Sequence, residues 1–240
     1  MSPLEVVDLG PGVLAAFTTR AAGNLGLGVG DDEAAVLRRR ARLAEWVGAP
    51  VAFGTQVHGA GVLLLDGPPR DPRTVGVADA YLAACADVAP AVLVADCVPV
   101  LLADPEARVV AAVHAGRVGL VAGVVRAAVA AAVRLGARAE RLRAALGPSI
   151  AGQSYEVPAA LRDEVAAVLP ESAATTAWGT PALDLRAAVV GELARAGVTS
   201  VVRVERDTFT DDGLYSHRRT VATGAPPGRS CGVVRLLAAV

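Results

Sequence analysis

The sequence predicts a mixed α/β fold that forms one domain over residues 1–240. Short apolar runs typical of strands alternate with longer segments whose apolar residues recur at helical spacing. No internal repeat, low-complexity linker or clear break in composition divides the chain. Its length and its 53% hydrophobic residues suffice for one large core, and an aromatic content of 3% means that Ala, Val and Leu must fill that core.

The first helix is expected to begin at Asp31 or Asp32 and to run to about Val47. Either aspartate can accept a hydrogen bond from the free N–H groups of the first turn, and Gly48 then ends the helix. The arginines at 38–40 lie mostly on the solvated face of this helix.

Several apolar runs bounded by Gly, Pro or Asp are predicted to be strands. Pro99 cannot donate to a strand ladder, so its strand begins there, lies at a sheet edge or carries a bulge just after Cys97. The Pro- and Gly-rich stretch 67–76 is expected to be an exposed loop. The predicted strands are Val62–Leu65, Ala91–Ala95, Val98–Leu102, Val109–Val113, Val201–Val204 and Val233–Leu237.

Three further helices are predicted downstream. The first covers Gly119–Leu135, and residues 115–119 (AGRVG) form the loop that leads into it from a strand. The second, Pro158–Leu169, has proline in its first turn, and the third, Asp184–Ala196, has an acidic cap.

Charge and composition exclude several classes of function. The formal net charge is -1, and no basic run is longer than 38–40, so a nucleic-acid partner is not expected. The amino terminus carries Glu5 and Asp8 where an export signal needs basic residues, and the apolar stretch Val118–Val133 is too short to span a bilayer. Three widely spaced cysteines argue against a disulfide framework, which favours a cytoplasmic location without membrane contact.

The residues with the strongest chemical signal are two of the three histidines and one cysteine. His58 lies in QVHG, Cys97 in VADC and His114 in AAVHAG, each beside a glycine or at the end of an apolar run. Imidazole and thiolate are preferred zinc ligands, and a catalytic zinc site keeps three protein ligands and one open position. The sequence therefore predicts a zinc site, although each residue singly is also compatible with a structural role.

The remaining cysteines and histidine receive other interpretations. Cys85 and Cys231 have no polar motif around them and are taken as core residues. His217 is flanked by arginines and is interpreted as a surface or substrate-contact residue. Asp96, next to Cys97, is either an acid/base group or a cap of the strand end.

Several arginines indicate an anion site. Arg20 in TTR and Arg218 in HRR present guanidinium groups that match phosphate or carboxylate, although either can equally form a structural ion pair. Arg117 stands at an expected helix amino terminus, where free N–H groups favour an anion next to His114.

Taken in order, these motifs resemble the bacterial laccase-domain proteins, a family first called polyphenol oxidases and now regarded as zinc-dependent purine nucleoside phosphorylases. The resemblance extends from TTR near the amino terminus to the end of the chain. The motifs that carry it are QVHG (56–59), VADCVPVLLAD (94–104), AAVHAG (111–116), GPSI (147–150), SYEV (154–157) and DTFTDDGLYSHRR (207–219).

The resemblance implies an α/β sandwich with one zinc ion held by the positions matching His58, Cys97 and His114. It also implies phosphorolysis of adenosine, inosine, guanosine and methylthioadenosine, with adenosine deamination as a companion activity. Nucleoside and phosphate are then the partners of a monomer or small homo-oligomer. The candidate substrate contacts are Arg20, Gln56, Arg117 and Arg218.

Three alternatives stand beside this interpretation. Cys97 as nucleophile with His114 as base would make a Cys/His hydrolase or amidase. A copper polyphenol oxidase is disfavoured because three histidines cannot supply several copper centres, which makes zinc the preferred metal over copper. The third alternative is a zinc-retaining scaffold or cell-wall editing accessory without turnover.

Overall fold

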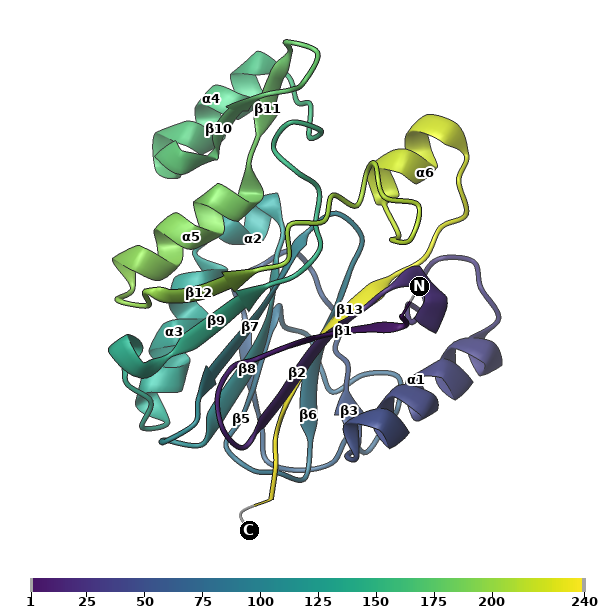
Figure 1. Ribbon diagram of the computed structural model, residues 1–240, viewed down its shortest axis with the longest axis vertical. Coiled ribbons are helices and arrows are strands. Elements are labelled where there is room, and N and C mark those ends of the chain that lie inside the picture. Colours follow the sequence, from purple (N-terminus) through teal and green to yellow (C-terminus); the bar gives the residue numbers. More distant parts are fainter. Residues whose placement is uncertain (1, 239–240) are drawn as a thin grey trace.

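The computed structural model describes residues 2–238 and confirms the mixed α/β fold (Figure 1). The helices are α1 (Glu33–Val47), α2 (Arg117–Val121), α3 (Val124–Arg134), α4 (Ala159–Val168), α5 (Leu185–Arg195) and α6 (His217–Thr223). The strands are β1 (Leu4–Val7), β2 (Val13–Thr18), β3 (Val51–Ala52), β4 (Val62–Leu65), β5 (Ala80–Ala83), β6 (Ala89–Val94), β7 (Val98–Asp104), β8 (Val109–Ala115), β9 (Arg143–Leu146), β10 (Ala173–Thr175), β11 (Pro181–Leu183), β12 (Ser200–Arg203) and β13 (Ser230–Leu236). Three short 3₁₀ turns cover Arg20–Ala22, Ala139–Arg141 and Pro170–Ser172.

Two sheets form the centre of the molecule. One has five strands in the order β1-β2-β13-β6-β3, and the other has six in the order β12-β9-β7-β8-β5-β4. A buried cluster that includes Phe17, Tyr81, Leu101 and Val110 combines residues from both sheets, so their inner faces pack together as a sandwich. The antiparallel pair β7–β8 lies in the middle of the larger sheet.

Helices cover the outer faces of both sheets. In Figure 1, α2, α3 and α5 lie along the six-stranded sheet and α1 lies on the opposite side of the molecule. The apolar layer under α3 and α5 consists of Ala, Val and Leu, as the low aromatic content predicted. Among residues 2–238, no helix has both the length and the apolar character that crossing a membrane requires.

The first predicted helix is confirmed at both ends. Asp32 caps α1, with its Oδ1 accepting a hydrogen bond from the Ala35 N–H at 2.8 Å, and Gly48 follows in the left-handed conformation with φ 74°. Arg40 departs from the predicted solvated face, because it is only 6% exposed and its guanidinium lies 4.1 Å from the centre of the Phe53 ring.

The predicted helix Gly119–Leu135 is wrong as a single element. It forms two helices, α2 and α3, because the chain takes φ +87° at Gly123, a left-handed conformation that glycine adopts without steric cost. Helix α2 also starts at Arg117, inside the segment that was expected to be a loop.

The predicted strands are confirmed to within a few residues, whereas others were missed. Strand β7 begins at Val98 and runs between β9 and β8, so Pro99 occupies the start of an interior strand. The missed strands β5 (AYLA) and β9 (RAAL) are rich in alanine, which intrinsically favours helix. Burial between neighbouring strands overrides that preference.

Candidate metal centre and substrate cavity

The structure brings together the three predicted metal ligands. The ligand atoms offered by His58, Cys97 and His114 all lie within 4.8 Å of one another. Cys97 Sγ is 3.9 Å from His58 Nε2, and the two imidazole rings are 4.7 Å apart in an edge-to-face arrangement of 76°.

Strand register explains how residues far apart in sequence meet. Cys97 directly precedes β7 and His114 lies near the end of β8, and the antiparallel register pairs Val98 with Ala115 and Pro99 with His114. The first residues of β7 and the last residues of β8 therefore share one end of the sheet. His58 reaches the same end from the loop that follows β3.

Asp79, which the sequence analysis missed, connects the loop of His58 to His114. It is fully buried, and its Oδ1 lies 2.8 Å from His114 Nδ1. The carboxylate also accepts hydrogen bonds from the backbone N–H groups of Val57, His58 and Gly59 at 3.2, 3.0 and 2.7 Å. The only signal in the sequence was an aspartate inside an otherwise apolar run, VADAYLAA.

Backbone strain is concentrated at this centre. His58 has φ 58° and Asp96 has φ 88°, and they are two of the three non-glycine residues with positive φ among residues 2–238. Such conformations persist at functional sites where neighbouring contacts hold them. Gly116 adds a steric constraint, because a Cβ there would lie 2.8 Å from His58 Cδ2 and 3.0 Å from Cys97 Sγ.

The electrostatics of the centre favour a thiolate. Burial raises the pKa of the Cys97 thiol, but interactions with His114 and His58 outweigh it and lower the pKa to about 6. Burial lowers the pKa of His114, but Asp79 and the Cys97 thiolate outweigh it and raise that pKa to about 9. The centre thus stabilises a negative sulfur between two imidazoles.

These donors fit a metal ion. One thiolate and two imidazoles are the donor types that zinc and copper accept, and three protein donors leave a coordination position for another ligand. His114 is buried, Cys97 is partly buried and His58 is exposed, so the cluster opens to one side.

A cavity of about 770 Å³ adjoins the cluster, and its lining is strongly cationic. Within the described part of the chain, Asp96 is the only carboxylate in the lining. Among residues 2–238, four of the five lining arginines have no carboxylate within ion-pair distance, and the fifth, Arg73, pairs with Glu33. The arginines without an ion pair are Arg40, Arg117, Arg218 and Arg229, of which Arg40 donates to three backbone carbonyls.

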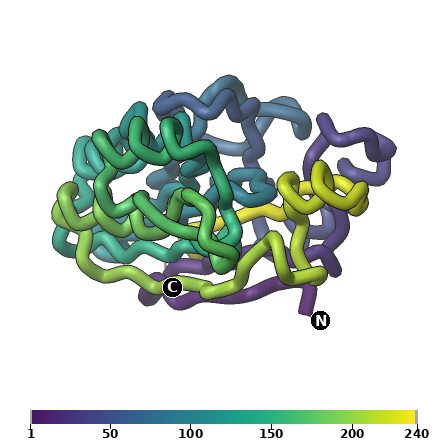
Figure 2. The backbone as a smooth tube through the Cα atoms, turned by 90° about the horizontal axis from the view of Figure 1, so that it is seen from above, coloured from purple at the N-terminus to yellow at the C-terminus, as the bar shows by residue number. Residues whose placement is uncertain are grey.

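Helix α6 forms one wall of this cavity. In Figures 1 and 2, α6 lies on the same side of the molecule as α1 and the loop before it, and the cavity lining includes Gly26–Val29 of that loop. The Arg218 guanidinium lies 5.0 Å from the centre of the Tyr155 ring and donates to Glu156 O at 2.8 Å. His217 is exposed and lines the cavity but is not in the ligand cluster, in agreement with the sequence interpretation.

Two of the predicted site residues line the cavity with their polar groups already engaged. Asp96 Oδ1 accepts a hydrogen bond from the Thr208 hydroxyl at 2.6 Å, and its Oδ2 accepts one from the backbone N–H of Arg218 at 2.6 Å. Gln56 pairs through both ends of its amide with the backbone of Leu93, at 2.8 and 2.7 Å. These contacts tie the site's loops together.

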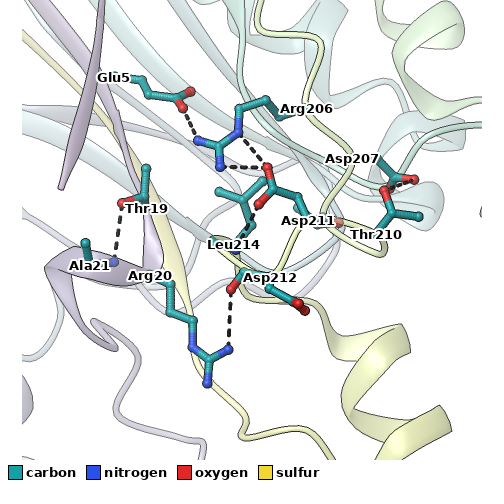
Figure 3. Close-up of polar contacts among 12 residues, drawn as sticks. Glu5, Thr19, Arg20, Ala21, Arg206, Asp207, Thr210, Asp211, Asp212 and Leu214 are labelled. Carbon is teal, nitrogen blue, oxygen red and sulfur yellow. Dashed lines mark hydrogen bonds and ion pairs between the residues drawn. The ribbon is translucent and has the colours of Figure 1, made fainter. Parts of the chain in front are cut away.

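Arg20 does not line the cavity. It donates to Asp212 O at 3.4 Å and lies 5.8 Å from the centre of the Tyr215 ring, as Figure 3 shows for the Asp212 contact. Its backbone N–H donates to Gly213 O at 2.8 Å. Arg20 therefore contacts the segment before α6, and its role as a substrate contact stays a prediction.

That segment is held by two further arginines. Arg206 contacts Glu5 and also pairs with Asp211 at 2.6 Å (Figure 3). Arg219 donates to four backbone carbonyls between Thr208 and Leu214. The wall formed by α6 is consequently fixed to the rest of the fold.

Sequence reasoning also missed two cavity residues. Tyr155 belongs to the SYEV motif but received no role, and Arg229 directly precedes β13. The backbone N–H of Arg229 donates to Asn24 Oδ1 at 2.8 Å, which places it beside the loop 26–29. Only the contact between the two ends of the chain brings Arg229 into the site.

The fold and this cluster define a laccase-domain protein. The family model described as multi-copper polyphenol oxidoreductase laccase matches residues 14–237, and the chain belongs to this family.

Similar sequences and solved structures support this family assignment. A Mycobacterium tuberculosis protein named purine nucleoside phosphorylase is 47% identical over 219 residues, which cover 86% of this chain and 87% of the relative. A Streptomyces coelicolor protein of the same name is 49% identical over 208 residues, 85% of this chain and 86% of the relative. The crystal structure of Neisseria meningitidis protein NMB0706 has a TM-score of 0.85 at 31% identity, covering 99% of this chain and 100% of that chain. YlmD from Geobacillus stearothermophilus has a TM-score of 0.84 at 30% identity, covering 95% and 93%.

Proposed function

We propose that this protein is a zinc-dependent purine nucleoside phosphorylase. The observation that carries the proposal is the cavity in which a His-Cys-His cluster adjoins arginines that no carboxylate neutralises. Such arginines bind an oxyanion such as phosphate. The name purine nucleoside phosphorylase, carried by relatives at 47% and 49% identity, supports the same conclusion.

In phosphorolysis, a phosphate oxygen forms a bond to C1′ of the ribose while the bond from C1′ to the base nitrogen breaks, and the base leaves with the bonding electrons and takes up a proton. Arg117 and Arg218, which line the cavity, are the proposed phosphate ligands. A bound zinc ion supplies a Lewis acid. Adenosine, inosine, guanosine and methylthioadenosine are the proposed substrates, with adenosine deamination as a companion reaction.

Zinc is proposed instead of copper on the chemistry of the whole chain. A multicopper oxidase needs several histidine-rich centres. This chain has three histidines, and His217 lies outside the cluster. We further propose that it acts in the cytoplasm, since its cysteines form no disulfide framework.

A nucleoside assay tests the proposal. Zinc-loaded protein incubated with inosine and phosphate should release hypoxanthine and ribose 1-phosphate, whereas omission of phosphate should abolish product. Loss of a charged hydrogen bond costs about 1.5–3 kcal/mol, so Arg218→Gln should raise the KM for phosphate by about 10-fold or more. Arg42→Gln, an exposed arginine on α1, is the matched control and should behave as wild type. Zinc-loaded protein that leaves all four nucleosides intact contradicts the proposal.

The second candidate is a Cys/His hydrolase, and one observation favours it. The ligand atoms of Cys97 and His114 lie within 4.8 Å, and His114 Nδ1 contacts Asp79, an order like that of a nucleophile, a base and an orienting carboxylate. Alkylation separates the two functions. Iodoacetamide should modify Cys97 in metal-free protein, and one equivalent of zinc should protect it while leaving the rate at Cys85 unchanged. A Cys97 thiolate that stays reactive with zinc present would favour the hydrolase.

A third candidate is a zinc-retaining scaffold without turnover. In that case His58→Ala would lower thermal stability with no activity to lose. Detectable phosphorolysis by the wild-type protein rules this candidate out.

A further inference from the structure

We infer that Asp79 is a positioning residue that orients two of the three metal ligands. The inference rests on the proposed metal site, but it concerns contacts that do not depend on the nucleoside reaction. Asp79 lies immediately before β5, and its backbone carbonyl accepts the His114 N–H at 2.7 Å. Backbone and side chain of Asp79 therefore both engage His114.

The side-chain contact fixes which imidazole nitrogen is free. A carboxylate can only accept hydrogen bonds, so the 2.8 Å contact places a proton on His114 Nδ1. In neutral imidazole the other nitrogen, Nε2, is then unprotonated and can bind a metal. Partners of this kind orient ligating histidines in many metal sites.

The backbone contacts act on the second ligand. Three consecutive N–H groups, of Val57, His58 and Gly59, point at the same carboxylate. They hold His58 in its left-handed conformation, φ 58°, which a histidine adopts at a steric cost. Without them, the loop would lose the contacts that direct the His58 side chain toward Cys97.

Asparagine at position 79 cannot reproduce this pattern. Its single carbonyl oxygen can replace only one carboxylate oxygen, and its amide then presents N–H to the remaining donors. If the amide takes the place of Oδ1, it opposes the His58 N–H and donates to His114 Nδ1, and the imidazole proton moves to Nε2, the atom needed for the metal. If the amide takes the place of Oδ2, it opposes the N–H groups of Val57 and Gly59, which hold the loop of His58. Either orientation weakens at least one ligand.

Cobalt binding tests the inference in the full-length protein. Co²⁺ bound to thiolate gives charge-transfer absorption, so both affinity and geometry can be read from titrations against a competing chelator. Asp79→Asn should weaken Co²⁺ binding by about 10- to 100-fold and alter the spectrum.

Asp104→Asn is the matched control. It changes another fully buried carboxylate with four donors, in the same sheet but without a metal ligand. It should retain the Co²⁺ affinity and spectrum of wild type. Wild-type affinity and spectrum in Asp79→Asn, or equal losses in both variants, would overturn the inference.

A measurement on the wild-type protein covers the case in which Asp79→Asn does not fold. In zinc-loaded protein with ¹⁵N-labelled histidine, His114 should carry its proton on Nδ1, and the chain's three histidines make assignment simple. A His114 without a proton on Nδ1 contradicts the inference. Because neither measurement uses a nucleoside, failure of phosphorolysis and failure of this inference are distinguishable.

Discussion

Asp79 and Asp104 are fully buried carboxylates at opposite ends of β8 and its neighbours in the central sheet, and each accepts four hydrogen bonds. The donors at Asp104 are the backbone N–H groups of the adjacent turn and of Arg138, together with the Arg141 side chain. The donors at Asp79 include the imidazole of His114 and the backbone of His58, two members of the candidate metal cluster.

Burial and satisfied hydrogen bonds do not by themselves distinguish a functional carboxylate from a structural one. Both aspartates have a lowered pKa, because hydrogen bonds to the charged form outweigh the effect of burial. What differs is the group that each carboxylate holds. Asp104 closes the β7–β8 turn against the segment at 138–141, whereas Asp79 fixes groups that face a cavity.

The largest effect is expected when the carboxylate of Asp104 is removed, because this destabilises the β7–β8 turn. Asp104→Ala leaves Arg141 and three backbone N–H groups without their acceptor, so unfolding free energy should fall by about 3 kcal/mol, as for a broken buried ion pair. Urea denaturation measures this loss, and Co²⁺ affinity should stay unchanged. Weakened Co²⁺ binding in Asp104→Ala would show that the contacts of Asp104 and the candidate metal cluster are coupled.

Metal removal should affect only the end of the central sheet that carries Asp79 and the candidate metal cluster. Zinc at about 100 times its dissociation constant should stabilise the fold by about 2.7 kcal/mol, which a chelator removes. Hydrogen exchange should then increase at residues 56–59 and 114–119, with no change at 104–109. An increase at 104–109 would break the distinction between the two ends.

The stability difference between wild type and Asp104→Ala should depend on pH. The hydrogen bonds hold the pKa of Asp104 below its usual 3.8, so the charged form stabilises the fold above that pH. This contribution is lost as pH falls through the folded-state value. Wild type and variant should therefore differ fully at pH 6 and converge in urea midpoint at acid pH. A gap that stays constant down to pH 2 would assign it to packing instead of charge.

The smallest effect is expected from removing one donor. Arg141→Gln loses the 3.1 Å contact to Asp104 while the three backbone donors remain, so stability should fall by about 1 kcal/mol. Thermal denaturation measures it. A loss as large as that of Asp104→Ala would mean that the ion pair, and not the backbone network, holds this turn.

Local signals in the sequence were enough for much of the fold and for the candidate metal cluster. The cap at Asp32, the stop at Gly48 and the alternation of apolar runs act over a few residues, and they predicted α1 and six strands. His58, Cys97 and His114 were found because imidazole and thiol are scarce here and stand at the ends of apolar runs. Gly123 shows the limit, because its left-handed conformation interrupts a pattern that otherwise indicates one helix.

The tertiary structure alone decided which charged groups face the cavity. Arg20 and Arg218 both stand in short polar motifs, TTR and SHRR, yet Arg218 lines the cavity and Arg20 contacts the segment before α6. Asp79 and Arg229 gain their roles from contacts with residues distant in the chain. The mixed α/β class and the candidate metal ligands followed from the sequence, because composition and short-range spacing encode both. Orientation and pairing of charges depend on strand register and loop packing, which exist only once the chain has folded.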